Sequence, residues 1–516
     1  MTHKTYLLLV FILVLASHLF GQTSSLIAIN NVGHLTYKAD EKGNVIPDFS
    51  GVGYQNSEVP ILNIPLVLTV NAVYRDNVAN VQDAINTVAA MPVQANGFRG
   101  AILFTSGLYK LSSAITLASS GIVLREEGTN TIFKATGTVQ YDLINVKGVL
   151  GKADVASSQK QITDAFVPIG AKSVTVHSGH TFQVGDWVHV RREPNAAWIS
   201  LLGMDLLASL GTGGTDWTPS TYKVSYERKI TNVVGNVLTF DAPIMDLIDP
   251  VNAKGFVVKF TSSRIEKCAV KNMKMTSAYT SPTDELHGWK AINMNNITNA
   301  WVKNVIADSF GYSCVSIDDG ASFVTVEGCS MLNLISIIRG GRRYSFVING
   351  QRSLLQNCTT KRGRHDFVDG SRTPGTNVFY NCRATIQNAD MGPHHRWSSN
   401  ILFDNIIGDG QLRVQNRVDS RSGHGWSGSQ IMFWNCTAAG IVVQDPPSYH
   451  RNWAIGCIGP ITNIGKWTTE LLGVLESNGT HIVAIPSLFL AQLYDRLATL
   501  STDDFQAAEF KKNKVN

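Results

Sequence analysis

The sequence predicts an all-β fold: a right-handed parallel β-helix with an N-terminal capping helix and a small inserted β module. A phrase ending in Asn or Gly recurs at a mean spacing of about 26 residues, which is typical of solenoid repeats. Each repeat holds two or three short β-branched runs. The 516 residues include 44 Gly and only 16% charged residues, as expected for buried strands joined by many turns. The repeat positions are Asn272, Asn304, Gly328, Asn357, Asn381, Asn405, Asn435 and Gly456.

The repeated Asn or Gly predicts a specific local geometry. A tight turn with a left-handed backbone favours these two residues, and stacked Asn side chains can hydrogen-bond along the solenoid axis. Four of the seven Cys follow the phrase directly: Cys329, Cys358, Cys382 and Cys436. A Cys at a fixed place in a repeat is expected to be a buried free thiol in a ladder, whereas an exported protein could instead use it in disulfides.

The N-terminal part is expected to hold an export signal, a cap and the first coils. Residues 1–21 have a positive start and an apolar run too short to span a bilayer, which indicates a signal peptide. The mature protein is therefore expected to be exported, periplasmic or secreted, with no membrane anchor. Residues 22–164 are assigned to the cap and first β-helix coils. Apolar spacing over 76–90 predicts a helix covering the open end of the solenoid, followed by strands at 101–104, 114–117 and 121–124.

The remaining chain divides into three parts. Residues 165–245 differ in residue pattern from the repeats and are expected to form an inserted β module that leans over the solenoid. Its aromatic residues are expected either to stack on sugar rings or to fill the module's own core: Trp198, Trp217, Tyr222 and Tyr226. Residues 246–470 are assigned to the coils that carry the site. Residues 471–516 are expected to form a C-terminal strand and helix cap, with a helix over 486–497 and a charged tail.

Basic clusters between Arg339 and Ser429 point to a binding site. From Arg339 to Arg372 there are eight Lys or Arg against two Asp, while the whole chain has a formal net charge of +5. Equivalent positions of successive coils lie about 4.8 Å apart, so these clusters are expected on one side of the solenoid. The alternative is a solvated basic face paired with scattered Asp. The accompanying His, Tyr and Trp instead favour a cationic cleft for an acidic sugar, because they serve proton transfer and sugar stacking.

The chain resembles the pectin-lyase-like superfamily of secreted carbohydrate-active enzymes. The resemblance lies in the lead-in at 46–50, the helix segment Gln82-Asp83-Ala84-Ile85 and the Asn-ended repeats. The combination of His394-His395-Arg396-Trp397 with Gly423-His424-Gly425-Trp426 resembles proteins of marine Bacteroidetes that degrade acidic algal polysaccharides. This resemblance implies a lyase or an oligosaccharide dehydratase acting on ulvan-like, uronate-containing fragments.

A second resemblance implies a different reaction. Ile317-Asp318-Asp319-Gly320 and the Gly-His-Gly around His424 are similar to motifs of polygalacturonase-type glycoside hydrolases. Here the two motifs lie about four coils apart, roughly 19 Å, whereas a glycosidase needs its two carboxyl groups within about 10 Å. The hydrolase is therefore the alternative prediction. Asp318 and Asp319 are then expected to be turn residues or a cation site.

The predicted reaction is elimination: removal of the C5 proton of a uronate and loss of the group at C4. Expulsion of a sugar makes the enzyme a polysaccharide lyase, and expulsion of water makes it a dehydratase. Arginines offset the carboxylate charge, while His and Tyr supply base and acid. The predicted catalytic residues are His365 and His395, with His394, His424 and Tyr344 in reserve. The predicted substrate-binding residues are Arg339, Arg342, Arg364, Arg396, Trp397, Arg417 and Trp426.

A third hypothesis is a non-catalytic β-helix that binds acidic glycan. The expected partner in every case is an acidic poly- or oligosaccharide. Nucleic acid is not expected, because the basic residues alternate with His and Trp rather than forming a continuous run. No metal or other cofactor is expected, although a divalent cation such as Ca²⁺ is an alternative. The oligomeric state is left open.

Overall fold

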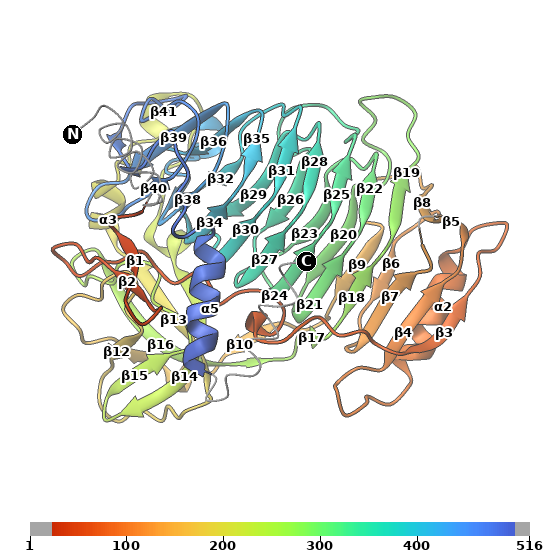
Figure 1. The fold of residues 1–516 in the computed structure, drawn as a ribbon, viewed down its shortest axis with the longest axis horizontal. Coiled ribbons are helices and arrows are strands. Elements are labelled where there is room, and N and C mark those ends of the chain that lie inside the picture. Colours follow the sequence, from red (N-terminus) through yellow and green to blue (C-terminus); the bar gives the residue numbers. More distant parts are fainter. Residues whose placement is uncertain (1–22, 129, 501–516) are drawn as a thin grey trace, which may run out of the picture.

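The computed structural model describes residues 23–128 and 130–500, and they form the predicted parallel β-helix (Figure 1). Three long sheets run along the solenoid, and neighbouring strands within each pair in parallel. The predicted signal peptide at 1–21 and the charged tail at 510–516 lie outside the described residues. No helix within the described ranges is long and apolar enough to cross a membrane.

Sheet 1 has 13 strands and is the longest. In spatial order it contains β3 (Leu66–Val70), β4 (Gly100–Phe104), β7 (Ile122–Glu126), β18 (Ala269–Lys271), β21 (Ile297–Lys303), β24 (Ser322–Glu327), β27 (Ser353–Gln356), β30 (Asn377–Tyr380), β34 (Ile401–Asp404), β38 (Met432–Trp434), β40 (Trp453–Ile455) and β43 (Val474–Glu476), with β17 (Ile265–Glu266) beside β21.

Sheets 2 and 3 complete each coil. Sheet 2 contains β5 (Gly107–Leu111), β8 (Thr131–Ala135), β19 (Lys274–Ser277), β22 (Ile306–Asp308), β25 (Ser330–Leu332), β28 (Thr359–Lys361), β31 (Arg383–Thr385) and β35 (Ile407–Gly408). Sheet 3 contains β6 (Ile115–Leu117), β9 (Ile144–Lys147), β20 (Lys290–Asn295), β23 (Ser313–Ile317), β26 (Tyr344–Ile348), β29 (His365–Ser371) and β32 (Gly392–His395). The last coils add β33 (Ser398–Ser399), β36 (Gln411–Val414), β37 (Gly428–Ser429), β39 (Gly440–Asp445), β41 (Ile461–Thr462) and β42 (Leu471–Leu472).

The turn from sheet 1 to sheet 2 has the predicted geometry. All eight repeat positions have positive φ, from 50° at Asn381 and Asn435 to 65° at Gly456. Asn side chains bond along the axis, since Asn381 Nδ2 donates to Asn357 Oδ1 at 2.6 Å and Asn304 Nδ2 donates to Asn272 Oδ1 at 3.1 Å. The left-handed turn therefore repeats in register from coil to coil.

The interior of the solenoid is a continuous apolar core. It includes Phe346, Phe367, Phe379, Phe403 and Phe433 from successive coils, each fully buried. The seven Cys are free and buried, as predicted for a thiol ladder. Cys358 Sγ, for example, contacts the carbonyl of Gln356 in its own coil and that of Val326 in the coil before it.

Helices cover an end and a face of the solenoid (Figure 1). Helix α2 (Val78–Ala89) lies at the predicted position over the first coils and buries Val81, Ala84, Ile85 and Val88. Helix α5 (Leu488–Leu500) matches the predicted C-terminal helix and packs on the outer face of sheet 1. Buried Asp404 accepts hydrogen bonds from Ser487 Oγ and Phe489 N at the start of α5, which fixes the helix to β34.

The N-terminal segment returns along the same outer face of sheet 1. After β1 (Ile27–Ile29) and β2 (Leu35–Tyr37), Ile46, Phe49 and Val52 are buried with residues of sheet 1 and α5. Phe49 N donates to Gln492 Oε1 at 2.9 Å, and Ser50 binds Arg496. The segment ends in the single-turn helix η1 (Tyr54–Ser57), whose Tyr54 packs edge-on against Trp301.

The inserted module is an antiparallel sheet beside the solenoid (Figure 1). It contains β10 (Lys152–Asp154), β11 (Lys160–Gln161), β12 (Ser173–Thr175), β13 (Trp187–Pro194), β14 (Val224–Val234), β15 (Val237–Phe240) and β16 (Ala253–Ser262). These strands extend on both sides of residues 165–245. Three short helices lie between β13 and β14: α3 (Ala196–Leu201), η3 (Ala208–Leu210) and η4 (Pro219–Tyr222); η2 (Ala156–Ser158) precedes β11.

The four aromatic residues singled out in the module do not face solvent. Trp198, Trp217 and Tyr222 are buried in one cluster, and Trp217 and Tyr222 stack with ring centroids 4.0 Å apart. Tyr226 is buried separately and bonds Ser399 Oγ. The expectation that these residues stack on sugar rings is therefore wrong, and the expectation that they pack in a core is correct. That core also contains side chains of the solenoid.

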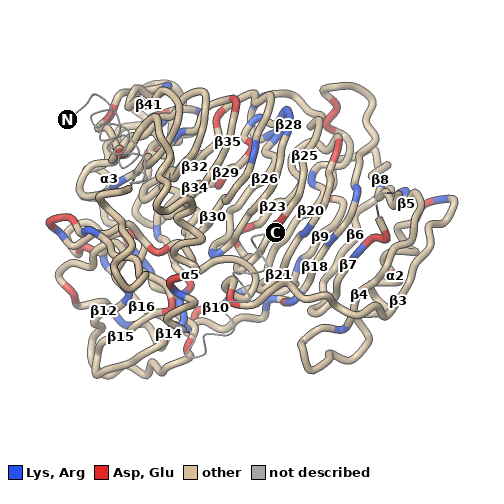
Figure 2. Tube along the Cα trace, viewed as in Figure 1, with Lys and Arg blue, Asp and Glu red and all other residues tan. Residues whose placement is uncertain are grey.

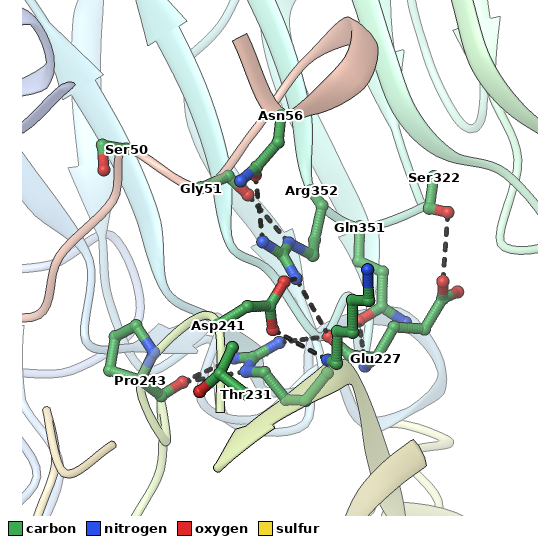
Figure 3. A network of polar contacts seen from close by, with 12 residues as sticks. Ser50, Gly51, Asn56, Glu227, Thr231, Asp241, Pro243, Ser322, Gln351 and Arg352 are labelled. Carbon is green, nitrogen blue, oxygen red and sulfur yellow. Dashed lines mark hydrogen bonds and ion pairs between the residues drawn. The ribbon is translucent and has the colours of Figure 1, made fainter. Parts of the chain in front are cut away.

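Buried Arg352 joins the N-terminal segment, the module and the solenoid (Figure 3). Its Nε donates to the Gly51 carbonyl at 2.8 Å, its Nη1 donates to Asp241 Oδ2 at 2.7 Å, and its Nη2 donates to Asn56 Oδ1 at 3.0 Å. The neighbouring side chain of Gln351 accepts from Glu227 N at 2.9 Å. The solenoid turn that carries Gln351 and Arg352 therefore holds both the N-terminal segment and the inserted module in place.

Glu227 forms a second buried ion-pair group in the same network. Its carboxylate accepts from Arg264 Nη2 at 3.1 Å and Ser322 Oγ at 3.1 Å, and it pairs with Lys152. Burial opposes ionisation, but Lys152 and Arg264 hold the pKa of Glu227 at about 2. The carboxylate is thus charged at neutral pH and ties β14 to β10 and β24.

Replacement of Arg352 tests this junction. We expect Arg352→Met to lower the free energy of unfolding by about 3–5 kcal/mol, because it leaves partly buried Asp241 and two oxygens without their buried donor. Denaturant unfolding followed by circular dichroism measures the change. The control is Arg383→Met at the exposed first residue of β31, for which a change within about 0.5 kcal/mol is expected. Equal effects of the two variants would contradict a structural role for the Arg352 network.

Candidate active site

A cavity of about 420 Å³ opens on the outer side of sheet 3. Its walls come from β26, β29 and β32, from segments before and after these strands, and from the loop that follows β36. Lys and Arg gather near β26 and β28 (Figure 2). The basic stretch singled out in the sequence therefore supplies most of this cavity. The lining residues are Tyr312, Gly340, Gly341, Tyr344, Val347, Asn349, Arg364, Asp369, Gly370, Ser371, His394, His395, Arg417, Arg421 and His424.

Parallel register brings these residues together. Tyr344 pairs with His365 between β26 and β29, and Ser371 pairs with His395 between β29 and β32. Gly370 lets the Asn349 side chain of the preceding coil lie close to the strand, because a Cβ at residue 370 would lie 2.1 Å from Asn349 Oδ1. Residues distant by one repeat in sequence thus become neighbours about 4.8 Å apart.

A hydrogen-bonded chain crosses the cavity floor from Arg417 through His394 to Tyr344. Arg417 Nη1 lies 3.1 Å from His394 Nδ1, and His394 Nε2 lies 3.0 Å from Tyr344 Oη. Arginine only donates, so Nδ1 is the acceptor and a neutral His394 carries its proton on Nε2. That proton is donated to Tyr344 Oη, which leaves the phenol's own proton free for a ligand.

Four histidines form a compact group around this chain. The ring centroids of His394 and His365 lie 4.4 Å apart, those of His394 and His395 lie 5.0 Å apart, and those of His395 and His424 lie 4.7 Å apart. Burial, together with nearby arginines, lowers the pKa of His395 to about 3 and that of His424 to about 2. Burial also holds the pKa of His394 well below its ordinary value. These imidazoles are therefore neutral at physiological pH.

His395 and His424 both have one buried ring nitrogen. The Nδ1 atoms of both are buried, with no hydrogen-bond partner among the described residues. A ligand in the cavity therefore reaches these imidazoles through Nε2. Neutral imidazoles without partners can accept a proton or a hydrogen bond.

His365 lies beneath the cavity and does not line it, contrary to its predicted catalytic contact. It is 2% exposed, and its ring packs edge-on against Tyr344 at 4.9 Å between centroids. Its Nδ1 bonds the Asp390 carbonyl at 2.7 Å. Burial lowers the pKa of His365, and the neighbouring His365 and Arg417 keep the pKa of Asp390 low despite its burial. The structure thus gives His365 a position that supports Tyr344 and His394.

The predicted arginines divide into two groups. Arg364 and Arg417 line the cavity. Arg364 donates to the Gly340 carbonyl, and its guanidinium lies 5.9 Å from the Tyr344 ring centre. Arg417 is 6% exposed and donates to the His394 carbonyl at 2.5 Å. Backbone carbonyls thus hold both guanidinium groups in place, and neither forms a salt bridge with a carboxylate of the described residues, although Asp390 interacts with Arg417 at longer range.

Arg339, Arg342 and Arg396 are not among the lining residues. Arg342 is paired with Glu285, with Nη2 and Oε2 2.9 Å apart, and this bidentate pair fixes a side loop. Arg396 donates to the carbonyl and hydroxyl of Ser422, both at 2.7 Å. Counting residues from the Asn or Gly of each coil locates a side chain to the right strand but not to the right residue. These three arginines were therefore wrongly placed in the cavity.

Trp397 and Trp426 are buried at 0% and 1% exposure, so the prediction that they bind substrate is wrong. Both belong to the aromatic cluster formed with Trp198 and Trp217 of the module. Trp397 Nε1 donates to buried Asp246 at 3.0 Å, and Trp426 Nε1 donates to the Leu202 carbonyl at 3.3 Å. Their role is to attach the module to the solenoid beside the cavity.

Several lining residues were not predicted from the sequence. Tyr312 precedes β23 and packs against Tyr344, with ring centroids 5.3 Å apart. Asn349 and Ser371 occupy strand ends of sheet 3, and Arg421 lies in the one-turn helix α4 (Ser420–Gly423) just before His424. Arg421 could have been found, since it lies inside the basic stretch. Tyr312, Asn349 and Ser371 carry no charge signal, and only the strand register reveals them.

The Asp pair of the hydrolase resemblance lies outside the cavity. Asp318 follows β23, its carbonyl accepts from Ala321 N in a turn, and its carboxylate lies 3.9 Å from Lys290 Nζ. Asp369 is the single acidic residue among the described lining residues, and burial raises its pKa well above the usual range. Two facing carboxylates, which a glycosidase requires, are thus not present among these lining residues. Nor do the described residues contain a group of three or more His, Cys, Asp or Glu placed to hold a metal ion.

Comparisons with known proteins give distant structural similarity alone. No protein-family model and no curated protein matches the chain. An alginate lyase from Paenibacillus sp. str. FPU-7 is similar over 80% of this chain and 99% of its own, with a TM-score of 0.40 and 10% identity. The HK620 tailspike of an E. coli bacteriophage, solved with a pentasaccharide, has a TM-score of 0.40 and 10% identity over 85% of this chain and 62% of its own. The tailspike gp49 of Pseudomonas phage LKA1 has a TM-score of 0.35 and 10% identity over 78% of this chain and 72% of its own. Similarity this low assigns neither a family nor an activity, and the β-helix is established by the strands themselves.

Proposed function

We propose that this protein is an exported carbon–oxygen lyase that acts on uronate-containing acidic saccharides. The observation that carries the proposal is the Arg417–His394–Tyr344 chain inside a cavity lined by two further arginines, Arg364 and Arg421. Cationic groups and neutral proton carriers are the two requirements of elimination next to a carboxylate. The proposed substrate partner is an acidic oligo- or polysaccharide of the ulvan type, and export rests on the predicted signal peptide.

The arginines are proposed to bind the uronate carboxylate. A guanidinium fork matches a carboxylate with two parallel hydrogen bonds. Positive charge beside the carboxylate stabilises the enolate-like state that forms when the C5 proton leaves. Arg364 and Arg417 suit this role because carbonyls hold them in place, so they need no reorganisation when the substrate binds.

His395 is proposed as the base that removes the C5 proton, with His424 as its neighbour. Both are neutral at physiological pH, because burial and the arginine charges lower their pKa. A bound carboxylate cancels part of the arginine charge and therefore raises the pKa of both imidazoles. The base thus becomes stronger when substrate is present.

Tyr344 is proposed as the acid that protonates the oxygen leaving C4. Burial raises its pKa, although Arg364 and Arg417 lower it in part, so the phenol keeps its proton. The Nε2–H of His394 points at the phenol oxygen and stabilises the phenolate that remains after proton transfer. The tyrosine can then regain a proton through His394 or solvent.

The experiment that tests the proposal is incubation of the purified protein with uronate-containing oligosaccharides. Elimination forms a conjugated unsaturated uronate, which absorbs in the ultraviolet, and new reducing ends are measured in parallel. We expect the absorbance to rise. Reducing ends without absorbance would support a glycoside hydrolase instead, and binding without any product would support a non-catalytic glycan-binding protein.

We expect Tyr344→Phe to lower kcat by about a hundredfold to ten-thousandfold, the usual contribution of a general acid. The ring keeps its contacts with Tyr312 and His365, so KM and the melting temperature should change little. The matched control is Tyr279→Phe, at a tyrosine that is 47% exposed and outside the cavity. A Tyr344→Phe enzyme with the wild-type rate would remove Tyr344 from the reaction.

Arg364 and Arg362 offer a matched pair in one turn. Arg364 lines the cavity, whereas Arg362 is exposed two residues earlier and does not. We expect Arg364→Gln to raise KM about tenfold to a hundredfold, because a hydrogen bond to a charged group contributes about 1.5–3 kcal/mol. Arg362→Gln should leave KM within about twofold. Initial rates over a range of substrate concentrations measure both, and equal KM values would contradict a local role of Arg364.

A further inference from the structure

A loop stands across one end of the cavity. The coil after β32 continues through β36, but the chain then leaves the solenoid and returns ten residues later. The two ends of this excursion pair antiparallel at Asn416 and Trp426, and Arg417 N donates to the Gly425 carbonyl at 2.8 Å. We call residues 416–426 the end loop. Its Arg417, Arg421 and His424 form the cavity wall on that side.

The inserted module supports the end loop from behind. Trp217 Nε1 donates to the Gly423 carbonyl at 3.1 Å, and Thr212 Oγ1 donates to Asp419. A Cβ on Gly423 would lie 2.4 Å from the Thr215 carbonyl, and one on Gly425 would lie 2.4 Å from Trp217 and from Met204. Both glycines have positive φ, 78° and 56°. The loop is thus packed tightly against the module.

A second segment supports the loop from the C-terminal side. Lys466 N donates to Gln415 Oε1 at 3.0 Å, and Asn416 Nδ2 donates to Glu470 Oε1 at 2.8 Å. The Trp467 ring centre lies 4.5 Å from the Arg417 guanidinium carbon. The end loop therefore has protein on both sides and cannot fold away from the cavity without losing these contacts.

The opposite end of the cavity has a different form. It finishes at Tyr312, which is half-buried and stacks beside Trp289 with ring centroids 6.1 Å apart. Sheet 3 continues past this point through β20, β9 and β6. A saccharide can extend along the solenoid in this direction, while the end loop stops it in the other.

We propose that the protein acts at the end of a saccharide chain and not within it. The proposal rests on the lyase function proposed above and names the form of its substrate. A cavity of about 420 Å³ lies low in the range of about 300–1,000 Å³ for small-molecule sites, which suits a terminal unit and its neighbour. An internal uronate would require the chain to leave through Arg417, Arg421 and the module behind them.

The chemistry at a terminal uronate with a free O4 hydroxyl is a dehydration. The base takes the proton from C5, the C–H electrons form the C4=C5 double bond, and the C4–O bond breaks. The departing hydroxyl receives the proton of Tyr344 and leaves as water, after which the base releases its proton to solvent and Tyr344 regains one through His394 or solvent. When O4 of the reacting uronate carries one terminal sugar, the same steps release that sugar.

The test compares uronate oligosaccharides of increasing length, labelled at the reducing end, at equal mass. We expect the initial rate of absorbance change per gram to fall in inverse proportion to chain length, because only chain ends react. Mass spectrometry of early products should show chains of unchanged length that have lost water, or chains shortened by one unit at one end. Early products cut in mid-chain, with a rate per gram independent of length, would overturn the proposal while leaving the lyase function standing.

A complete lack of unsaturated product from every length would overturn the lyase function, and this proposal with it. A loop variant adds a structural test. Replacing residues 419–422 by two glycines lowers the end loop, and we expect mid-chain products to appear. A variant that folds, as judged by its melting curve, and still reacts only at chain ends would show that this loop does not set the specificity. The wild-type product profile decides the proposal whether or not the variant folds.

Discussion

The constant register of the coils is the constraint on which the rest of the structure depends. Each coil turns from sheet 1 to sheet 2 through one left-handed residue, Asn or Gly, and therefore begins its next strand at the same height. Sheet 3 inherits this register, so side chains of successive coils form columns about 4.8 Å apart. The cluster of His365, His394, His395 and His424 that this register brings together would repel itself if it were charged. Burial removes this problem by keeping the imidazoles neutral.

The two kinds of basic side chain in the cavity differ in charge. The imidazoles lose charge on burial, but the guanidinium groups keep theirs, and Arg364 and Arg417 are bonded to carbonyls instead of carboxylates. The protein thus keeps a positive field in the cavity that an incoming anion can neutralise. The carboxylate of Asp390, whose pKa is kept low by His365 and Arg417 despite its burial, is not among the described lining residues. Within this arrangement a ligand's carboxylate supplies the missing negative charge.

The sequence was sufficient for the parts of the fold that local chemistry determines. The Asn and Gly turns, the Cys ladder, helix α2 and helix α5 all follow from residue type and spacing, and the structure confirms them. The approximate position of the cavity also follows, because its cationic residues recur at one side of successive coils. These features depend on neighbours within one repeat.

The residues that sequence reasoning misplaced depend on distant partners. Trp397 and Trp426 are buried because Trp198 and Trp217, about 200 residues away in the chain, pack against them. Arg396 and Trp397 both have φ of 57°, so the alternation of a strand, which would predict their sides, ends at His395. Arg342 forms an ion pair with Glu285 of another loop. A pattern along one strand contains none of this information.

The N-terminal segment has a consequence for the time course of folding. Gly51 bonds Arg352, which is 301 residues away, and Phe49 bonds Gln492, which is 443 residues away. In a chain made from its N-terminus, the solenoid coils can stack one after another as they emerge, since each needs only the coil before it. The contact of Phe49 with Gln492 forms only when nearly the whole chain exists, because Gln492 lies in the last helix, whereas Gly51 can bind Arg352 earlier. The residues around Phe49 are therefore made early but reach their final place late, and their attachment to α5 completes the fold of the described residues.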